Sequence, residues 1–369
     1  MPKRLVVCCD GTWNTADQSK NGHPCPTNVT RLHRSVASID ARGVAQSTYY
    51  HPGVGTSRWE HFSGGAFGVG LSTNVLDAYR YLIANYEPGD DLYFFGFSRG
   101  AFTARSIVGL VRNCGILRPD NIDRLKEAYA LYRSKEHEPS GETSARFRTA
   151  YSHSPDIRFI GVWDTVGALG IPALGPGFLH RLTNRINRRW GFHDTELSSH
   201  VRAAFHAVAI DEQRSAFKPT LWQKQSTAAE QIVEQVWFAG VHCNVGGGLS
   251  DTSLADLALL WMVQKAQEHG LAFRPDAFSS GLFSVAPDPL RFPDRSRVGF
   301  YRLAREWDRP IGMETGKYRG SEQSLAGSVQ ELRDKEPDRY APRQLVAYLN
   351  AGVPRVTQVP RSYSTTAAR

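Results

Sequence analysis

Residues 92–100 read Leu-Tyr-Phe-Phe-Gly-Phe-Ser-Arg-Gly and place a Gly-x-Ser-x-Gly motif directly after an apolar run. A strand is predicted over 92–95, and a helix over 99–113, where apolar residues recur at helical spacing before Gly115. A strand, a tight turn and a helix in this order are the setting of a nucleophile elbow, which exposes a serine hydroxyl at the head of the helix. Because the chain holds 33 glycines, the motif alone is weak, and its context carries the prediction that Ser98 is a nucleophile.

Four more apolar runs have the length of strands, and each ends at a polar or glycine-rich turn. They cover residues 5–9, 157–163, 204–210 and 233–239. Helices are predicted over 74–86 and from Ser253 to about Gly270, the second with Asp256 as the capping-box partner of Ser253. Strands that alternate with helices predict an α/β fold, here of the α/β-hydrolase type, with a mostly parallel central sheet flanked by helices.

The chain has 369 residues, which is enough for one large domain with insertions. We expect an α/β-hydrolase domain over residues 1–350. Residues 171–200 interrupt the pattern with prolines, glycines and a basic cluster, so we predict a lid-like insertion there. Residues 271–369 are rich in Pro, Arg and Asp, and we expect the stretch 351–369 to be a poorly ordered tail.

The composition is that of a folded globular protein, with 41% hydrophobic and 22% charged residues. The five cysteines form no CxxC pair, so neither a disulfide framework nor structural zinc is expected. The apolar run near the N-terminus stops at Asp10, which argues against a cleaved signal peptide. No apolar stretch approaches the roughly 20 residues that cross a bilayer. We therefore expect a cytoplasmic protein, unless a machinery that needs no cleaved signal exports it.

The formal net charge of +8 predicts attraction to an anionic partner. A basic cluster with a tryptophan lies inside the expected insertion and suits both an anionic membrane surface and the solvated face of a lid. The cluster consists of Arg181, Arg185, Arg188, Arg189 and Trp190. Since the sequence contains no recognised nucleic-acid-binding module, binding to nucleic acid is not expected.

A serine hydroxyl needs a general base, and one of the 12 histidines stands out by its position. His242 follows the predicted strand 233–239 in the loop Gly240–Gly248, whose glycines allow the imidazole to reach the edge of the sheet. His206 is its rival, but it lies inside an apolar run, where a structural histidine of the core is expected. The glycines 246–248 lack phosphate-loop spacing, so no nucleotide is expected, and the chemistry requires no cofactor.

An acidic residue must orient the imidazole, and two aspartates at the ends of predicted strands qualify. Asp164 follows the apolar run 157–163, and Asp211 follows the run 204–210. Both keep the chain order Ser, Asp, His of the α/β-hydrolase type. We favour Asp164, because a polar pair ends a fully apolar strand abruptly there, and Asp211 stays an alternative.

The loop Asp10-Gly11-Thr12, after the first predicted strand, is a candidate for stabilising negative charge on a substrate. The backbone amides of Gly11 and Thr12, together with that of Arg99 at the head of the helix, are candidate donors to an oxyanion. Asp10 is expected to lock the loop by accepting backbone hydrogen bonds. A metal-binding role for Asp10 is not expected, since no cluster of further ligands accompanies it.

Three stretches, in this order, resemble the DUF2235 family of α/β-hydrolases, which includes the catalytic domain of Tle1-type phospholipase effectors delivered by type VI secretion. They are Asp10–Asn14 (DGTWN), Gly96–Ala101 (GFSRGA) and Gly240–Gly248 (GVHCNVGGG). The family pattern around the histidine usually reads HSDVGGG, so Cys243 and Asn244 depart from it.

The resemblance implies that Ser98, Asp164 and His242 hydrolyse esters through an acyl-enzyme, with a phospholipid or another lipid ester as substrate. It also implies that a type VI system is a route of export. The long C-terminal extension of effector members is not seen, which weakens the interpretation as a toxin. Two alternatives stay open, namely a cytoplasmic esterase or thioesterase acting on a small soluble acyl compound, and a catalytically silent binding protein.

Overall fold

The computed structural model describes residues 2–11, 14–20, 22–53, 66–134, 136–167, 197–297, 306–314, 317–318, 322–352 and 354–365. Most of the insertion predicted over 171–200 lies outside these ranges, and so does the whole basic cluster from Arg181 to Trp190. Thr12, a predicted amide donor, also lies outside them. The lid-like insertion and its membrane contact therefore stay predictions.

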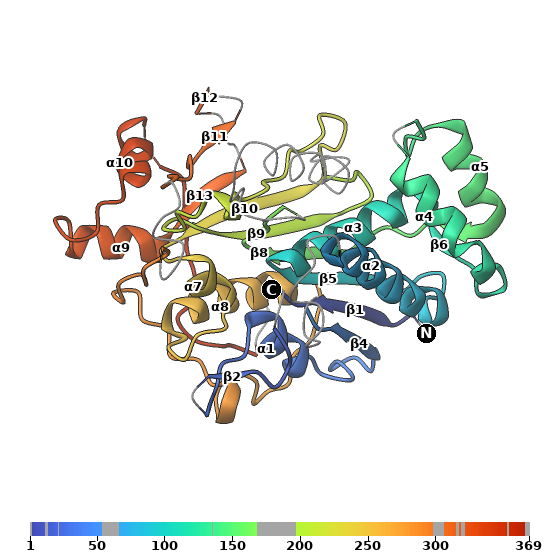
Figure 1. The fold of residues 1–369 in the computed structure, drawn as a ribbon. Coiled ribbons are helices and arrows are strands. Elements are labelled where there is room, and N and C mark those ends of the chain that lie inside the picture. Colours follow the sequence, from blue (N-terminus) through green and yellow to red (C-terminus); the bar gives the residue numbers. More distant parts are fainter. Residues whose placement is uncertain are drawn as a thin grey trace.

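Eight parallel strands form the central sheet (Figure 1). Their order is β14-β13-β10-β9-β8-β5-β1-β4, and every pair of neighbours runs parallel. The strands span Arg4–Cys9 (β1), Gln46–His51 (β4), Asp91–Phe97 (β5), Phe159–Trp163 (β8), Ala203–Ala209 (β9), Ile232–Phe238 (β10), Gln323–Ala326 (β13) and Val356–Thr357 (β14). The predicted α/β class, with a mostly parallel sheet flanked by helices, is confirmed.

Helices cover both faces of the sheet, which explains why its central strands are apolar on both sides (Figure 1). One face of the sheet is covered by α2 (Ala66–Asn85) and α3 (Arg99–Cys114), which pack against every second residue of β1. The opposite face is covered by α1 (Asn28–Ser35) and α8 (Ser253–Glu268), which pack against the β1 residues in between. The other α-helices that the described ranges contain are α4 (Leu125–Arg133), α5 (Glu142–Tyr151), α7 (His242–Gly246), α9 (Gly327–Lys335) and α10 (Arg343–Asn350).

Short elements connect this framework. Three two-stranded antiparallel ladders are β2 (Ser19–Lys20) with β3 (His23–Pro24), β6 (Ile116–Leu117) with β7 (Ser152–His153), and β11 (Met313–Glu314) with β12 (Lys317–Tyr318). Among the described residues, three 3₁₀ turns span Pro119–Arg124, Ser215–Phe217 and Gly281–Phe283. In the described part of the chain, every helix is too short or too polar to cross a membrane.

The start of α8 differs from its prediction in one respect. α8 begins at Ser253 as expected, but Thr252 is its N-cap and its side chain makes no capping hydrogen bond, so the predicted capping box does not form. The N–H of Ser253 donates instead to Oδ1 of Asp251 at 3.0 Å. The carboxyl group of Asp256 instead lies 2.5 Å from Nη1 of Arg31 and accepts the N–H of Ala286 at 2.7 Å. A fully buried carboxylate needs a countercharge, and this requirement outweighs a local cap.

The C-terminal part contributes more to the core than its sequence pattern indicates. Leu325 of β13 and Val329 of α9 are buried, and α10 adds Leu345. We expected a poorly ordered tail over 351–369, whereas β14 extends the central sheet beside β13. A strand of two residues leaves no periodic pattern from which it could be predicted.

Candidate active site

Ser98 lies on a sharp turn between β5 and α3, with φ 58° and ψ −121°. A positive φ is costly for a residue with a side chain, so the surrounding structure must hold this turn in place. The N–H of Ser98 donates to the carbonyl of Trp163 at 3.0 Å, which continues the pairing of β5 with β8. The strand, turn and helix predicted around the motif are present.

Close backbone contacts explain the two glycines of the motif. A Cβ atom on Gly100 would lie 2.1 Å from the carbonyl oxygen of Cys9, and one on Gly96 would lie 2.5 Å from that of Gly100. Both obstacles are main-chain atoms, so neither can turn aside as a flexible side chain does. The backbone packing therefore requires both glycines, whatever Ser98 does.

His242 is the first residue of α7, and its ring lies between Ser98 and Asp164. Its Nε2 atom is 2.8 Å from Oγ of Ser98, and its Nδ1 atom is 2.5 Å from Oδ2 of Asp164. The rings of Phe97 and Phe217 flank the imidazole at centroid distances of 4.6 and 4.9 Å. Burial lowers the pKa of His242, an effect that Asp164 opposes, so the neutral imidazole prevails at neutral pH.

Of the two candidate aspartates, the structure brings only Asp164 to the imidazole. Asp164 follows β8, with φ 40°, and is fully buried. Oδ2 of Asp211 instead accepts the N–H of Gly240 at 2.7 Å and the hydroxyl of Tyr340 at 3.0 Å. Burial raises the pKa of Asp211 to about 7, although both hydrogen bonds oppose this shift. Asp211 therefore supports the loop before His242 and does not contact its ring.

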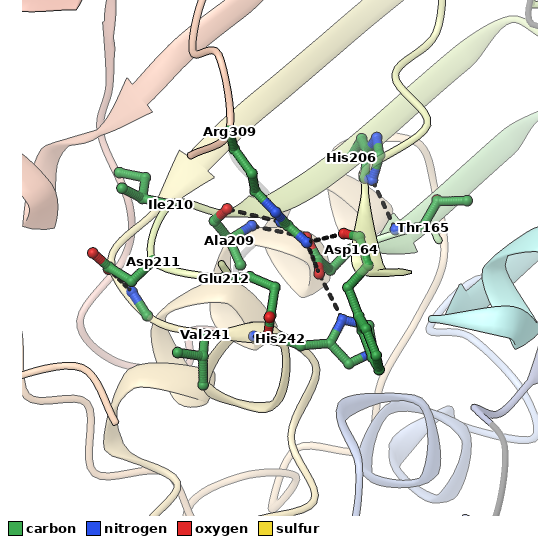
Figure 2. A network of polar contacts seen from close by, with 12 residues as sticks. Asp164, Thr165, His206, Ala209, Ile210, Asp211, Glu212, Val241, His242 and Arg309 are labelled. Carbon is green, nitrogen blue, oxygen red and sulfur yellow. Dashed lines mark hydrogen bonds and ion pairs between the residues drawn. The ribbon is translucent and has the colours of Figure 1, made fainter. Parts of the chain in front are cut away.

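Arg309, which the sequence pattern does not predict, lies against Asp164 in the candidate site (Figure 2). Its Nη1 and Nη2 atoms lie 2.5 and 3.0 Å from the two carboxylate oxygens of Asp164, and both side chains are fully buried. Burial would raise the pKa of Asp164, but Arg309 and His242 hold it well below its ordinary value. Arg309 lies in a stretch without periodic apolar positions, so no local signal marks it.

A second carboxylate approaches His242 from the end of β9. Oε2 of Glu212 accepts the backbone N–H of His242 at 3.3 Å and pairs with Nη2 of Arg214 at 2.7 Å. Burial would raise the pKa of Glu212, but Arg214 holds it below its ordinary value. Figure 2 shows Glu212 beside the backbone of His242. Glu212 thus fixes the backbone of the histidine while Asp164 contacts the ring.

Asp10 accepts four hydrogen bonds at the end of β1, one from the backbone of its own loop and three from side chains of other segments. The donors are the N–H of Gly11 at 2.7 Å and the hydroxyls of Thr27, Thr30 and Tyr50 at 2.6, 3.0 and 2.8 Å. Burial raises the pKa of Asp10, and these hydrogen bonds oppose that shift. Because the Gly11 amide donates to Asp10, it is committed to its own loop, which disagrees with its predicted role as an oxyanion donor.

His206, the rival base, lies in the core. Its Nε2 atom accepts the N–H of Thr165 at 3.1 Å (Figure 2). Its ring packs edge-on against Trp222. Burial lowers the pKa of His206 to about 3, so the ring is neutral over the physiological range. Within the described ranges, no three or more His, Cys, Asp or Glu side chains gather in a way that could hold a metal ion.

The contacts from Asp164 through His242 to Ser98 form a path along which a hydroxyl proton can move to Nε2. The carboxylate faces Nδ1 and favours the tautomer that carries its hydrogen there, which leaves Nε2 as the acceptor. Arg99 is the first residue of α3, and the N–H groups of the first turn of a helix point out of its N-terminal end. The head of α3 therefore favours negative charge next to Ser98.

Comparison with known families gives one match that covers most of the chain. Residues 3–265 match the family described as type VI secretion system phospholipase effector Tle1-like, catalytic domain. Among curated proteins, the uncharacterized protein YEL023C of Saccharomyces cerevisiae is 28% identical over 241 residues. The matched region is 58% of this chain and 32% of that protein, so the chain spans about a third of the length of this relative.

Two solved structures are similar to the chain at low identity. An uncharacterized protein from Pseudomonas aeruginosa is 21% identical with a TM-score of 0.46, and the match covers 74% of this chain and 46% of that one. The Tle1 effector bound to the VgrG spike of the type VI secretion system is 18% identical with a TM-score of 0.32. That match covers 67% of this chain and 52% of the effector chain.

Proposed function

This chain belongs to the family of Tle1-like catalytic domains, and on that premise we propose that it is a serine hydrolase of the α/β-hydrolase type that cleaves carboxylic esters of lipids. The observation that carries the proposal is the contact path from Asp164 through His242 to Ser98, with distances of 2.5 and 2.8 Å. The strained turn at Ser98 supports it, because backbone strain of this kind gathers at functional sites.

In the proposed reaction, Ser98 Oγ attacks the acyl carbon of the ester while Nε2 of His242 takes the hydroxyl proton. Asp164 holds the N–H of Nδ1 and stabilises the imidazolium that forms. The imidazolium then protonates the leaving alcohol, and an acyl-enzyme remains on Ser98. A water molecule, deprotonated in turn by His242, attacks the acyl carbon and releases the fatty acid.

The oxyanion formed in each step needs hydrogen-bond donors. The backbone amide of Arg99 at the head of α3 is the first proposed donor. The amide of Thr12 is the second, since the neighbouring Gly11 amide donates to Asp10. In this proposal, Asp10 holds the backbone of the loop in place, and the amide of Thr12 donates a hydrogen bond to the oxyanion of the substrate.

The substrate class comes from the family, whose description names a phospholipase effector. We propose a phospholipid or another lipid ester, reached at an anionic membrane surface by the basic cluster from Arg181 to Trp190. The net charge of +8 favours such a surface. Delivery by a type VI secretion system is part of the same proposal.

A fluorophosphonate probe, which reacts covalently with activated serines, tests the nucleophile. The purified wild type should be labelled, whereas Ser98→Ala and His242→Ala should not. His200→Gln, which changes a partly exposed histidine, is the matched control and should label like the wild type. A folded wild-type protein that resists the probe would refute the hydrolase and leave a silent binding protein.

Release of fatty acid tests the substrate. Vesicles of phosphatidylethanolamine and phosphatidylglycerol are compared with monomeric p-nitrophenyl butyrate. Turnover that rises on the vesicles supports the lipid substrate. Turnover of the soluble ester alone would replace it with a small soluble acyl compound.

A further inference from the structure

Arg309 is fully buried and makes four polar contacts. Figure 2 shows it beside Asp164 and Ala209. Nη1 lies 2.5 Å from Oδ1 of Asp164 and 2.8 Å from the carbonyl oxygen of Ala209. Nη2 lies 3.0 Å from Oδ2 of Asp164 and 2.6 Å from the carbonyl oxygen of Phe217. The planar guanidinium therefore meets both oxygens of the carboxylate, while two backbone carbonyls fix its plane.

These contacts saturate the carboxylate of Asp164. Oδ1 also accepts the N–H of Ala209 at 3.0 Å, and Oδ2 faces Nδ1 of His242 at 2.5 Å. An ionised carboxylate has about four acceptor positions, so four donors leave it a single orientation. That orientation aims Oδ2 at the imidazole and keeps the Nε2 atom of His242 toward Ser98.

We propose that Arg309 is a positioning residue that fixes the Asp164 carboxylate, balances its charge and thereby sets the pH range in which His242 acts as a base. This inference rests on the hydrolase function proposed above. The contacts of Arg309 reach Ser98 through Asp164 and His242, so the arginine acts through another residue. It is not itself assigned to touch the substrate.

Charges of both signs surround His242, and their balance decides at which pH it takes up a proton. Burial lowers the pKa of His242, Asp164 and Glu212 raise it, and Arg214 lowers it further. Arg309 acts on this balance by neutralising the strongest of the acidic partners. The titratable and charged groups around the imidazole and its carboxylate are Asp164, Glu212, Arg214, Cys243, His206 and Arg309.

Removing the guanidinium leaves the charge of Asp164 without its balance. If Asp164 stays ionised, its stronger attraction for the imidazolium raises the pKa of His242. If Asp164 takes up a proton itself, it stops accepting the N–H of Nδ1. In both cases the neutral, correctly oriented base is lost at a higher pH than in the wild type.

The test compares Arg309→Met, which removes the charge, with Arg309→Lys, which keeps it but cannot bridge both oxygens. The ratio kcat/KM on monomeric p-nitrophenyl butyrate is measured against pH. We expect Arg309→Met to move the acidic limb upward by about one to two pH units. Arg309→Lys should keep the wild-type limb but lose about tenfold or more in kcat. Arg202→Met, which removes an exposed arginine 3.0 Å from Asp156, is the matched control and should change neither.

A second readout does not depend on turnover. Nitrogen-15 NMR of labelled histidines, with the His242 signals assigned by their loss in His242→Gln, should show the same upward shift in Arg309→Met. The inference would be overturned if folded Arg309→Met had the same acidic limb of kcat/KM as the wild type and its His242 signals titrated at the same pH. If Arg309→Met does not fold, a wild-type kcat in Arg309→Lys would overturn it. A wild type that hydrolyses no ester would refute the proposed function, whereas the NMR titration would still decide the role of Arg309.

Discussion

The ends of the neighbouring strands β8 and β9 each carry an aspartate, and the two carboxyl groups behave in opposite ways. Asp164, after β8, is fully buried against Arg309, which holds its pKa well below its ordinary value. Asp211, after β9, is partly buried and accepts hydrogen bonds from Gly240 and Tyr340, and burial raises its pKa to about 7.

The difference shows that the position of an aspartate at the end of a strand does not determine whether its carboxyl group is ionised. Both aspartates lie at the carboxyl edge of a parallel sheet, where functional residues of α/β folds gather. Only the one with a guanidinium partner stays fully charged when water is removed. The arginine from a distant segment is thus what distinguishes the two aspartates. Asp164, which it keeps charged, is suited to orient a base, and Asp211, which has no such partner among the residues that the structure describes, is suited to hold a loop.

The largest expected contrast is in catalysis. Asp164→Asn should lower kcat by about 10⁴-fold, because an amide no longer favours the imidazole tautomer that carries its hydrogen on Nδ1. Asp211→Asn should leave kcat close to the wild-type value. Ester hydrolysis by the two purified variants measures the contrast. A large loss in Asp211→Asn together with an active Asp164→Asn would reverse the assignment.

Glu212, which also follows β9, should matter for stability. Glu212→Gln weakens the pair with Arg214 and the contact with the backbone of His242, and should cost about 2 kcal/mol in the free energy of unfolding. The exposed pair of Arg202 with Asp156 supplies the control, since Asp156→Asn should cost less than about 1 kcal/mol. Urea unfolding measures the free energy of unfolding of both variants. Equal losses would contradict the prediction that the buried pair contributes more to stability than the exposed pair.

The pH dependence of stability reports on Asp211. Its folded pKa of about 7 lies above its unfolded pKa, so the folded protein binds the extra proton between about pH 4 and 7. The wild type therefore loses stability as pH rises through that window, and Asp211→Asn lacks this loss. Between pH 5 and 8 the variant should gain about 2 kcal/mol relative to the wild type. A difference between the two proteins that is independent of pH would show that Asp211 has no raised pKa.

The smallest expected effect belongs to Tyr340. Tyr340→Phe removes one donor to Asp211 and should cost about 1 kcal/mol in the free energy of unfolding at pH 8, where the carboxylate is charged. At pH 5 the loss should be smaller, because the protonated carboxyl group needs that donor less. Urea unfolding at the two pH values measures it. A loss of stability in Tyr340→Phe that is larger at pH 5 than at pH 8 would contradict this prediction.

Much of the site could be predicted from the sequence where the signal is local. The elbow at Ser98 is encoded by a contiguous strand, two glycines and a helix, and close backbone contacts at Gly96 and Gly100 give the glycines their physical reason. His242 could be predicted because it follows an apolar strand in a glycine-rich loop. His206 could be set aside because it lies within such a strand.

Other features could not be predicted, since they depend on partners far away in the chain. Asp256 was expected to cap a helix, but Arg31, 225 residues earlier, binds it instead. Asp10 is predicted to accept backbone hydrogen bonds, but three of its four donors are the hydroxyls of Thr27, Thr30 and Tyr50, which lie 17, 20 and 40 residues later. In both cases a buried charge takes the donor within its reach, and a linear pattern does not show which donor that is.

The sequence by itself determined the α/β class, the strands that form the centre of the sheet, and the serine and the histidine of the candidate site. Each of these depends on the hydrophobic pattern and turn chemistry of contiguous residues. The tertiary structure alone decided which aspartate meets His242 and that Arg309, 145 residues beyond Asp164, pairs with it. The reason is physical, because the charge state of a buried carboxylate depends on the groups that surround it in space, and folding brings those groups together from distant segments.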